Sequence, residues 1–151
     1  MRIETTKDIL QHSRKFHKLI AEYYHSLSKN SEKERVKLLL NYLEERENQI
    51  EKTLEEMELS LSSHVLNSWF SHSQCQSRLD ELAKLVTEEN PDIDKVIDQF
   101  IYMDNCLIRI YSKLVHSAEN VDVQEFFDNL TKLEENHKKK ILKNASQFQD
   151  I

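Results

Sequence analysis

Apolar residues recur every three to four positions in four long segments of the 151-residue sequence. This is the spacing of a helix that buries one face, so we predict four amphipathic α-helices. Only short polar breaks separate the first helix from the second and the third from the fourth, which predicts two antiparallel pairs. The predicted helices span residues 6–27, 31–60, 91–116 and 122–145.

Local signals indicate where the later helices begin. Asn90 followed by Pro91 is typical of a helix start, with Asn as the cap and Pro in the first turn. At two other places a capping residue is followed three positions later by Glu, which is the pattern of a capping box. These pairs are Ser31 with Glu34 and Asp122 with Glu125. Residues 146–151 are expected to form a frayed tail.

The stretch 61–90 is polar and irregular, and it is predicted to be a long crossover between the two helix pairs. Residues 65–70 form an apolar patch within it, predicted to be helical for a turn or two. Trp69 and Phe70 are expected to anchor this patch to the bundle or to a second subunit. A further short helix is predicted over residues 78–86. The crossover is long enough for the third helix to begin at either end of the bundle.

Composition supports a single all-α domain over residues 1–151. The sequence has no Gly and one Pro, whereas β-rich folds need frequent turn residues. The formal net charge of -6 argues against a nucleic-acid partner. The sequence contains neither an apolar run of about 18 residues nor an apolar signal-peptide core, so no membrane partner is expected. Cys75 and Cys106 are expected to be reduced thiols in a cytoplasmic protein.

A Glu and a His interrupt the apolar face of the fourth predicted helix. Glu134 and His137 are three residues apart, so they lie on one face about one turn apart. Leu130, Leu133 and Ile141 recur on nearly the same face, which should point into the core. A buried carboxylate is unfavourable unless it is paired, hydrogen-bonded or bound to a metal. Glu134 and His137 are therefore candidates for a buried polar or metal site.

The sequence also shows an internal repeat, because its two halves align without a gap at an offset of 87 residues. In each half a Tyr lies seven residues, and a Glu thirty residues, after a polar residue on the core face. This shared spacing indicates a duplication of one helix pair. The aligned positions are His17 with Asp104, Tyr24 with Tyr111, Glu47 with Glu134, and Ile50 with His137.

These residues resemble the rubrerythrin-like branch of the ferritin-like di-iron proteins. Each half of that family reads Glu, six residues, Tyr, and then a helix with Leu, three residues and Glu-x-x-His. The matching residues of the second half are Asp104, Tyr111, Leu130, Glu134 and His137. Asp104 stands where the family has Glu. The first half matches less closely, because His17 replaces a Glu and Ile50 replaces the histidine.

The resemblance implies a ferritin-like four-helix bundle that binds iron or manganese through carboxylates and imidazoles. Glu47, Asp104, Glu134 and His137 would be the metal ligands, and His17 is a possible further ligand. Because Ile50 cannot bind a metal, the ligand set is degenerate and favours one metal ion over two.

Under this hypothesis the protein acts on peroxide, oxygen or free iron, and Tyr24 and Tyr111 orient the ligands. The sequence has no rubredoxin-type Cys-x-x-Cys pair, so redox chemistry would need an external electron donor.

A second hypothesis keeps the bundle but not the metal. The protein would then be a dimeric interaction or regulatory module, and the leftover carboxylates and imidazoles would share charge. We expect a homodimer. Two other sites are disfavoured: a zinc site at His72 and Cys75 lacks further ligands, and a phosphotransfer histidine usually has Gly beside it.

Overall fold

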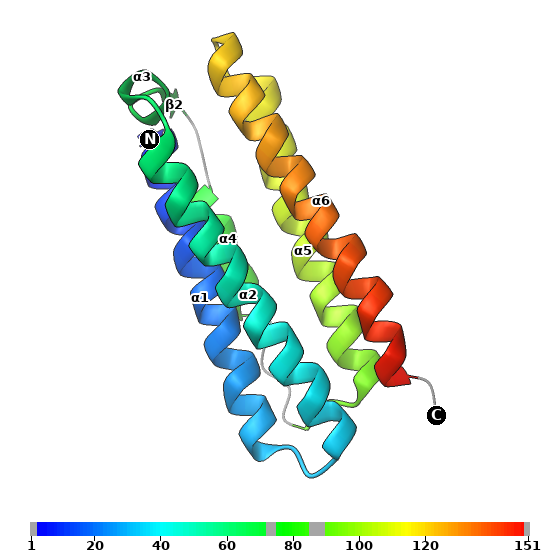
Figure 1. Ribbon diagram of the computed structural model, residues 1–151. Helices are drawn as coiled ribbons and strands as arrows, with labels where there is room; N and C mark the ends of the chain where they lie inside the picture. The colour runs from blue at the N-terminus through cyan, green and yellow to red at the C-terminus, as the bar shows by residue number, and fades with distance from the viewer. Residues whose placement is uncertain (1–2, 72–74, 85–89, 150–151) are drawn as a thin grey trace.

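The computed structural model describes residues 3–71, 75–84 and 90–149, and within them four long helices form a bundle (Figure 1). The long helices are α1 Thr6–Asn30, α2 Glu34–Ser60, α5 Ile93–Ser117 and α6 Val121–Gln149. The smaller elements are β1 Ile3–Thr5, α3 Ser63–Leu66, β2 Trp69–Ser71 and α4 Cys75–Lys84. The predicted all-α helical bundle is confirmed. Among the described residues, no helix is both long and apolar enough to cross a membrane.

The bounds of the helices agree with the internal repeat. α1 and α5 each span 25 residues, and α5 and α6 begin 87 residues after α1 and α2 respectively. Three residues separate the two helices of each pair. Because bounds and connections coincide, residues related by the offset occupy equivalent positions in the two pairs.

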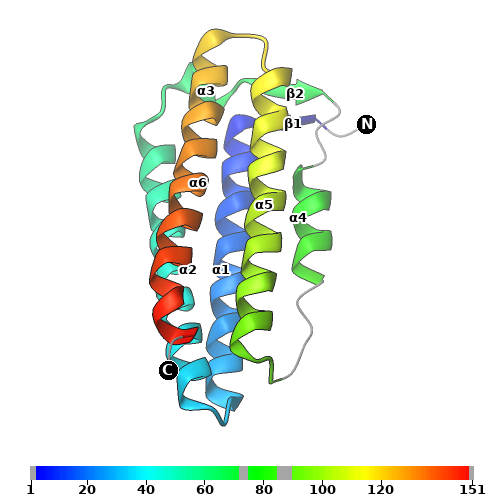
Figure 2. The ribbon, with the colours of Figure 1, turned by 90° about the vertical axis from the view of Figure 1, so that its right-hand side faces the viewer.

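The crossover takes the chain from one end of the bundle to the other. α2 finishes at the end where the N-terminus lies, and α5 begins at the opposite end, beside the turn between α1 and α2 (Figures 1 and 2). α4 lies within this crossover and packs against α1 and α5, with Leu79 and Leu82 buried. It begins three residues before the predicted start at 78, and the predicted end at 85–86 lies outside the described residues. As a result, α2 and α6 are antiparallel neighbours.

A two-stranded antiparallel sheet joins the N-terminus to the crossover, and it was not predicted. β1 pairs with β2 so that Glu4 lies opposite Phe70. The N–H of Thr6 donates to the Ser68 carbonyl oxygen at 2.8 Å, which extends this connection. Residues 65–70 are therefore helical only in their first part, within α3, before the chain becomes extended.

The sheet explains why only one of the two predicted anchors is buried. Phe70 is 5% exposed and its ring packs edge-on against Phe127, with centroids 5.5 Å apart. Trp69 is 63% exposed, so its predicted role as an anchor on the bundle is wrong. Successive side chains of a strand point to opposite faces, so adjacent residues cannot both face the core. Packing of Trp69 on a second subunit stays a prediction.

The predicted starts of three helices are wrong in detail. α2 begins after Lys33, which makes no side-chain cap bond, so the capping box expected at Ser31 is absent. α5 begins after Asp92, whose carboxylate accepts from the Lys95 N–H at 2.9 Å, rather than at Asn90. Asn90 instead has a positive φ of 52°.

The cap of α6 is Asn120 rather than the predicted Asp122. The Asn120 side-chain oxygen accepts from the Val123 N–H at 2.9 Å. Asn120→Ala should therefore lower the free energy of unfolding by about 1 kcal/mol, because it leaves a helix N–H without an acceptor. Asp122→Ala, the matched control, should lower it by no more than about 0.5 kcal/mol. Urea unfolding of both variants measures the difference, and equal losses would contradict the assignment.

The C-terminal helix extends beyond its predicted end at residue 145, and side-chain contacts explain the difference. The Phe148 ring packs on Tyr42 with centroids 6.0 Å apart, and Asn144 donates to the Tyr42 hydroxyl at 2.9 Å. These contacts with α2 stabilise the last turns of α6, so residues 146–149 do not form the frayed tail that was predicted.

Candidate metal centre

All four long helices contribute a polar side chain to the middle of the bundle. His17 comes from α1, Glu47 from α2 and Asp104 from α5, while α6 contributes both Glu134 and His137. Each lies among apolar residues on the inward stripe of its helix, and none is more than 6% exposed. Because the helices are rigid and closely packed, these side chains are held together even though they are far apart in sequence.

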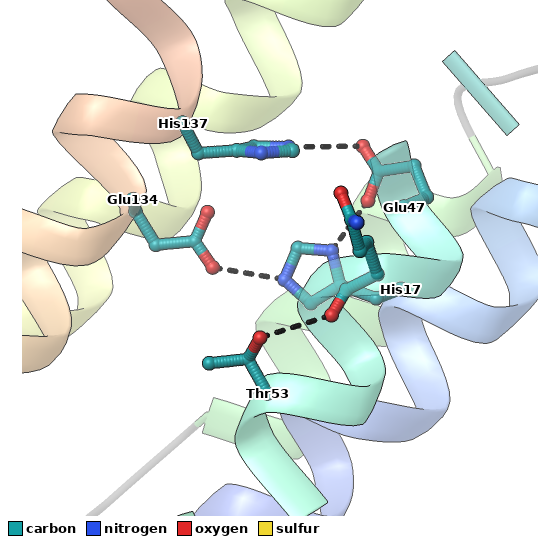
Figure 3. Close-up of polar contacts among 6 residues, drawn as sticks. His17, Glu47, Thr53, Glu134 and His137 are labelled. Carbon is teal, nitrogen blue, oxygen red and sulfur yellow. Dashed lines mark hydrogen bonds and ion pairs between the residues drawn. The ribbon is translucent and has the colours of Figure 1, made fainter. Parts of the chain in front are cut away.

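His17 lies between two carboxylates from different helices (Figure 3). Its Nδ1 is 2.5 Å from Glu47 Oε2, and its Nε2 is 2.9 Å from Glu134 Oε1. Both ring nitrogens can donate at once only when the imidazole is protonated. In that form the ring is a cation that links α1, α2 and α6 through two charge-assisted hydrogen bonds.

His137 approaches the same cluster from the opposite side (Figure 3). Its Nε2 is 3.9 Å from Glu47 Oε1, which is within range of an ion pair but too long for a hydrogen bond. Its ring also packs edge-on against Phe100, with centroids 6.0 Å apart. His137 is thus fixed by packing while its Nε2 has no hydrogen-bond partner among the described residues.

The electrostatic environment shifts the pKa values of these groups in opposite directions. Burial opposes the charged form of Glu47, but His17 and His137 outweigh it and lower the Glu47 pKa to about 2. Burial also opposes protonation of His17, yet Glu134 and Glu47 raise its pKa well above the usual value. The pKa of Asp104 is raised to about 9, by burial first and then by the charges of Glu134 and Glu47.

Several buried polar atoms of the cluster have no hydrogen-bond partner within the described part of the chain. These atoms are Glu134 Oε2, Asp104 Oδ2, His137 Nε2 and the hydroxyl oxygens of Tyr24 and Tyr111. Buried polar groups without a partner are rare and costly, so such a group calls for an explanation such as a bound water or ion. The cluster therefore has donor and acceptor capacity that the described residues leave unused.

The side chains are not arranged as a preformed coordination sphere. Among residues 3–71, 75–84 and 90–149, no three His, Cys, Asp or Glu groups already converge closely enough to hold a metal ion. His17 is the physical reason on the α1 side, since its two nitrogens engage the carboxylates that would otherwise face each other. Coordination of an ion would require the remaining side chains to adjust.

Comparison with known proteins identifies the fold. No protein-family model and no curated protein matches the sequence. Among solved structures, the chain is similar to a Thermotoga maritima protein provisionally described as a ferritin-like diiron-carboxylate protein. The TM-score is 0.59 at 17% sequence identity, and the match covers 97% of each chain. The chain has a ferritin-like fold. At this identity the likeness does not extend to the rubrerythrin-like subgroup that the sequence resembles.

The ferritin-like fold brings together the five predicted site residues, but it makes the two halves unequal. His17 and Asp104 occupy equivalent positions, as do Ile50 and His137. The half with His17 therefore offers an imidazole already bonded to two carboxylates, and Ile50 adds no donor. In the half with Asp104 and His137, both residues have a buried polar atom without a hydrogen-bond partner among the described residues. Whether these residues bind a metal stays a prediction.

Other polar candidates from the sequence do not join this site. Cys75 is buried at the start of α4, and burial raises the pKa of its thiol to about 12. His72, which could have paired with Cys75 in a zinc site, lies outside the described residues.

Sequence reasoning missed a pocket between α2 and α6 that His137 helps to line. Arg46 and Lys140 also line it. The signal that could have found this pocket is the repeat itself, because both helices contribute polar residues at equivalent positions.

Proposed function

We propose that this ferritin-like protein binds one iron or manganese ion through Glu47, Asp104, Glu134 and His137. The observation that carries the proposal is the group of buried, unpartnered donor atoms on Asp104, Glu134 and His137. Mixed carboxylate and imidazole donors suit these metals. When bound, such an ion would supply redox chemistry towards oxygen or peroxide, or take part in iron handling.

In this proposal His17 is primarily a positioning residue. Its hydrogen bonds to Glu47 Oε2 and Glu134 Oε1 hold one oxygen of each carboxylate and leave the other oxygen free to turn towards an ion. Hydrogen bonds to metal-binding carboxylates fix their orientation. His17 would become a ligand only by giving up one of these two bonds. This arrangement, together with Ile50 in place of a histidine, favours one ion over two.

Metal titration of the purified protein tests the proposal. We expect about one manganese or iron ion per chain, and His137→Ala should weaken binding at least about tenfold because it removes the nitrogen ligand. His116→Ala is the matched control, since His116 is exposed near the end of α5. Bound metal should also raise the melting temperature of the wild type, because the ion binds the folded state.

Two outcomes would contradict the proposal in different ways. If His137→Ala binds metal as tightly as the wild type, the ion is held elsewhere. If the protein contains essentially no metal after growth with iron or manganese, the metal-free interaction or regulatory module is the better hypothesis. Circular dichroism of His137→Ala establishes that lost binding is not lost folding.

A further inference from the structure

A pocket of about 200 Å³ opens between α2 and α6, above the buried cluster. Each helix contributes four residues to it, and the two sets are related by the offset of 87 residues. The lining is Arg46, Gln49, Ile50 and Thr53 from α2 with Leu133, Asn136, His137 and Lys140 from α6. The duplication thus places a polar pocket on the axis that relates the two halves.

The charged residues of this pocket are concentrated at one end. α2 and α6 are antiparallel (Figure 1), and Arg46 comes first of the four on α2 whereas Lys140 comes last of the four on α6. These two cations are therefore at the same level, while Thr53 and Leu133 lie at the other end. Gln49 and Asn136 occupy equivalent positions between the two ends and add side-chain amides.

The guanidinium of Arg46 is held by one hydrogen bond but can donate further hydrogen bonds. Its Nη1 donates to Gln49 Oε1 at 2.6 Å, which orients the planar group. Its Nε is buried and has no partner among the described residues. At the floor of the pocket, His137 is 6% exposed; its Nε2 forms no hydrogen bond with the described residues and lies 3.9 Å from Glu47 Oε1 in the buried cluster. The Nε of Arg46 is therefore the buried donor that this lining leaves available to a ligand.

The charge of the lining identifies the chemistry of a ligand. None of the eight lining residues is acidic, although the chain as a whole has 27 Asp and Glu residues against 21 Lys and Arg residues. An Arg and a Lys without a carboxylate between them attract an anion, and the planar fork of Arg matches the oxygen atoms of carboxylate or phosphate.

We propose that this pocket binds a small oxyanion of the phosphate or carboxylate class. Arg46 and Lys140 provide the charge, Asn136 provides a polar contact, and His137 lies at the floor. The inference goes beyond the proposed metal site and does not depend on it, because every contact that supports it belongs to the metal-free protein. It also gives His137 a position between the buried cluster and the pocket.

Titration of the metal-free protein with inorganic phosphate, followed by phosphorus NMR at low salt, tests this site. We expect saturable binding, and Arg46→Gln or Lys140→Gln should weaken it about tenfold or more through loss of a charge-assisted contact. Arg46→Lys keeps the charge but loses the Nε donor, so it should also bind more weakly than the wild type. A parallel titration with acetate, followed by amide NMR shifts, separates phosphate from carboxylate preference.

Lys139→Gln is the matched control, because it removes the same charge one residue from Lys140, where the side chain points about 100° away around the helix. It should weaken phosphate binding by less than about threefold. Equal losses in Lys139→Gln and Lys140→Gln would overturn the proposal in favour of general electrostatic attraction. Absence of saturable binding of both anions would also overturn it. Manganese titration of the same samples reports on the metal site separately, so either proposal can fail alone.

Discussion

Replacing His17 by leucine is expected to destabilise the metal-free protein by about 3–5 kcal/mol near neutral pH. The imidazole is buried and forms hydrogen bonds with Glu47 and Glu134 at 2.5 and 2.9 Å. Leucine fills a similar volume, but it leaves two buried carboxylates without their shared partner. The loss should appear as a lower urea midpoint with a similar dependence on urea concentration.

An exposed His–Glu pair provides the control for this substitution. His25 Nδ1 is 3.1 Å from Glu44 Oε1, and the His25 side chain is 49% exposed. His25→Leu should therefore cost no more than about 1 kcal/mol. Adding Glu47→Gln to His17→Leu should restore part of the lost stability, because it removes one of the unpaired charges. A loss for His17→Leu as small as that for His25→Leu would contradict a charged His17 at the centre of the cluster.

Asp104→Asn is expected to stabilise the metal-free protein, and the gain should grow with pH. Burial and the nearby charges of Glu134 and Glu47 raise the pKa of Asp104 from 3.8 to about 9. The folded protein therefore keeps a proton on Asp104 that the unfolded chain releases above pH 3.8. Wild-type stability consequently falls as pH rises from about 4 to 9. Asn does not titrate, so it escapes this loss.

The expected gain at pH 8 is on the order of 1–4 kcal/mol, because each pH unit between the unfolded and folded pKa values of Asp104 weakens the wild type by at most about 1.4 kcal/mol. At pH 4 the two proteins should differ little, because this pH is close to the unfolded pKa of 3.8 and the loss of wild-type stability has only begun there. Urea unfolding at several pH values measures the difference, with Asp98→Asn on the exposed side of α5 as the control. A difference that does not change between pH 4 and 8 would contradict the raised pKa.

The two stability experiments measure how the cluster affects the stability of the metal-free protein, whereas the metal titration measures how tightly the same cluster binds a cation. Buried carboxylates such as Asp104 reduce the stability of the metal-free protein, whereas a bound cation would make use of them. If the metal proposal is right, Asp104→Asn should stabilise the metal-free protein while weakening metal binding. Residues retained at the expense of stability in this way are typical of functional sites.

Much of the bundle could be predicted because the information is local. The stripe of Leu39, Leu40 and Leu43 and its counterparts in the other helices indicate which faces are buried. The match of spacing between the halves predicted that His17, Glu47, Asp104 and Glu134 would share the core, and all four are buried there. Short polar breaks within each half predicted that the first helix pairs with the second and the third with the fourth, and the structure has three-residue connections at both places.

Helix starts were harder to predict, because several residue types near each start can act as the cap. Ser31, Asn90 and Asp122 all match capping preferences, yet the helices begin directly after Lys33, Asp92 and Asn120 instead. The Thr5–Asp8 capping box of α1 was likewise not recognised. Which candidate acts as the cap depends on how the connecting segment packs. The candidates lie only a few residues apart, and a cap contributes only about 1 kcal/mol to stability.

The sequence by itself determined the helices, their buried faces, the duplication and the identity of the core polar residues, because these follow from periodic spacing along the chain. Only the tertiary structure decided that His17 bridges Glu47 and Glu134 and that Trp69 faces outwards. It also decided that Arg46 and Lys140 meet at one end of a pocket. The physical reason is that these features depend on which helices are neighbours, in which direction they run, and how two strands pair when Glu4 and Phe70 are 66 positions apart in the sequence.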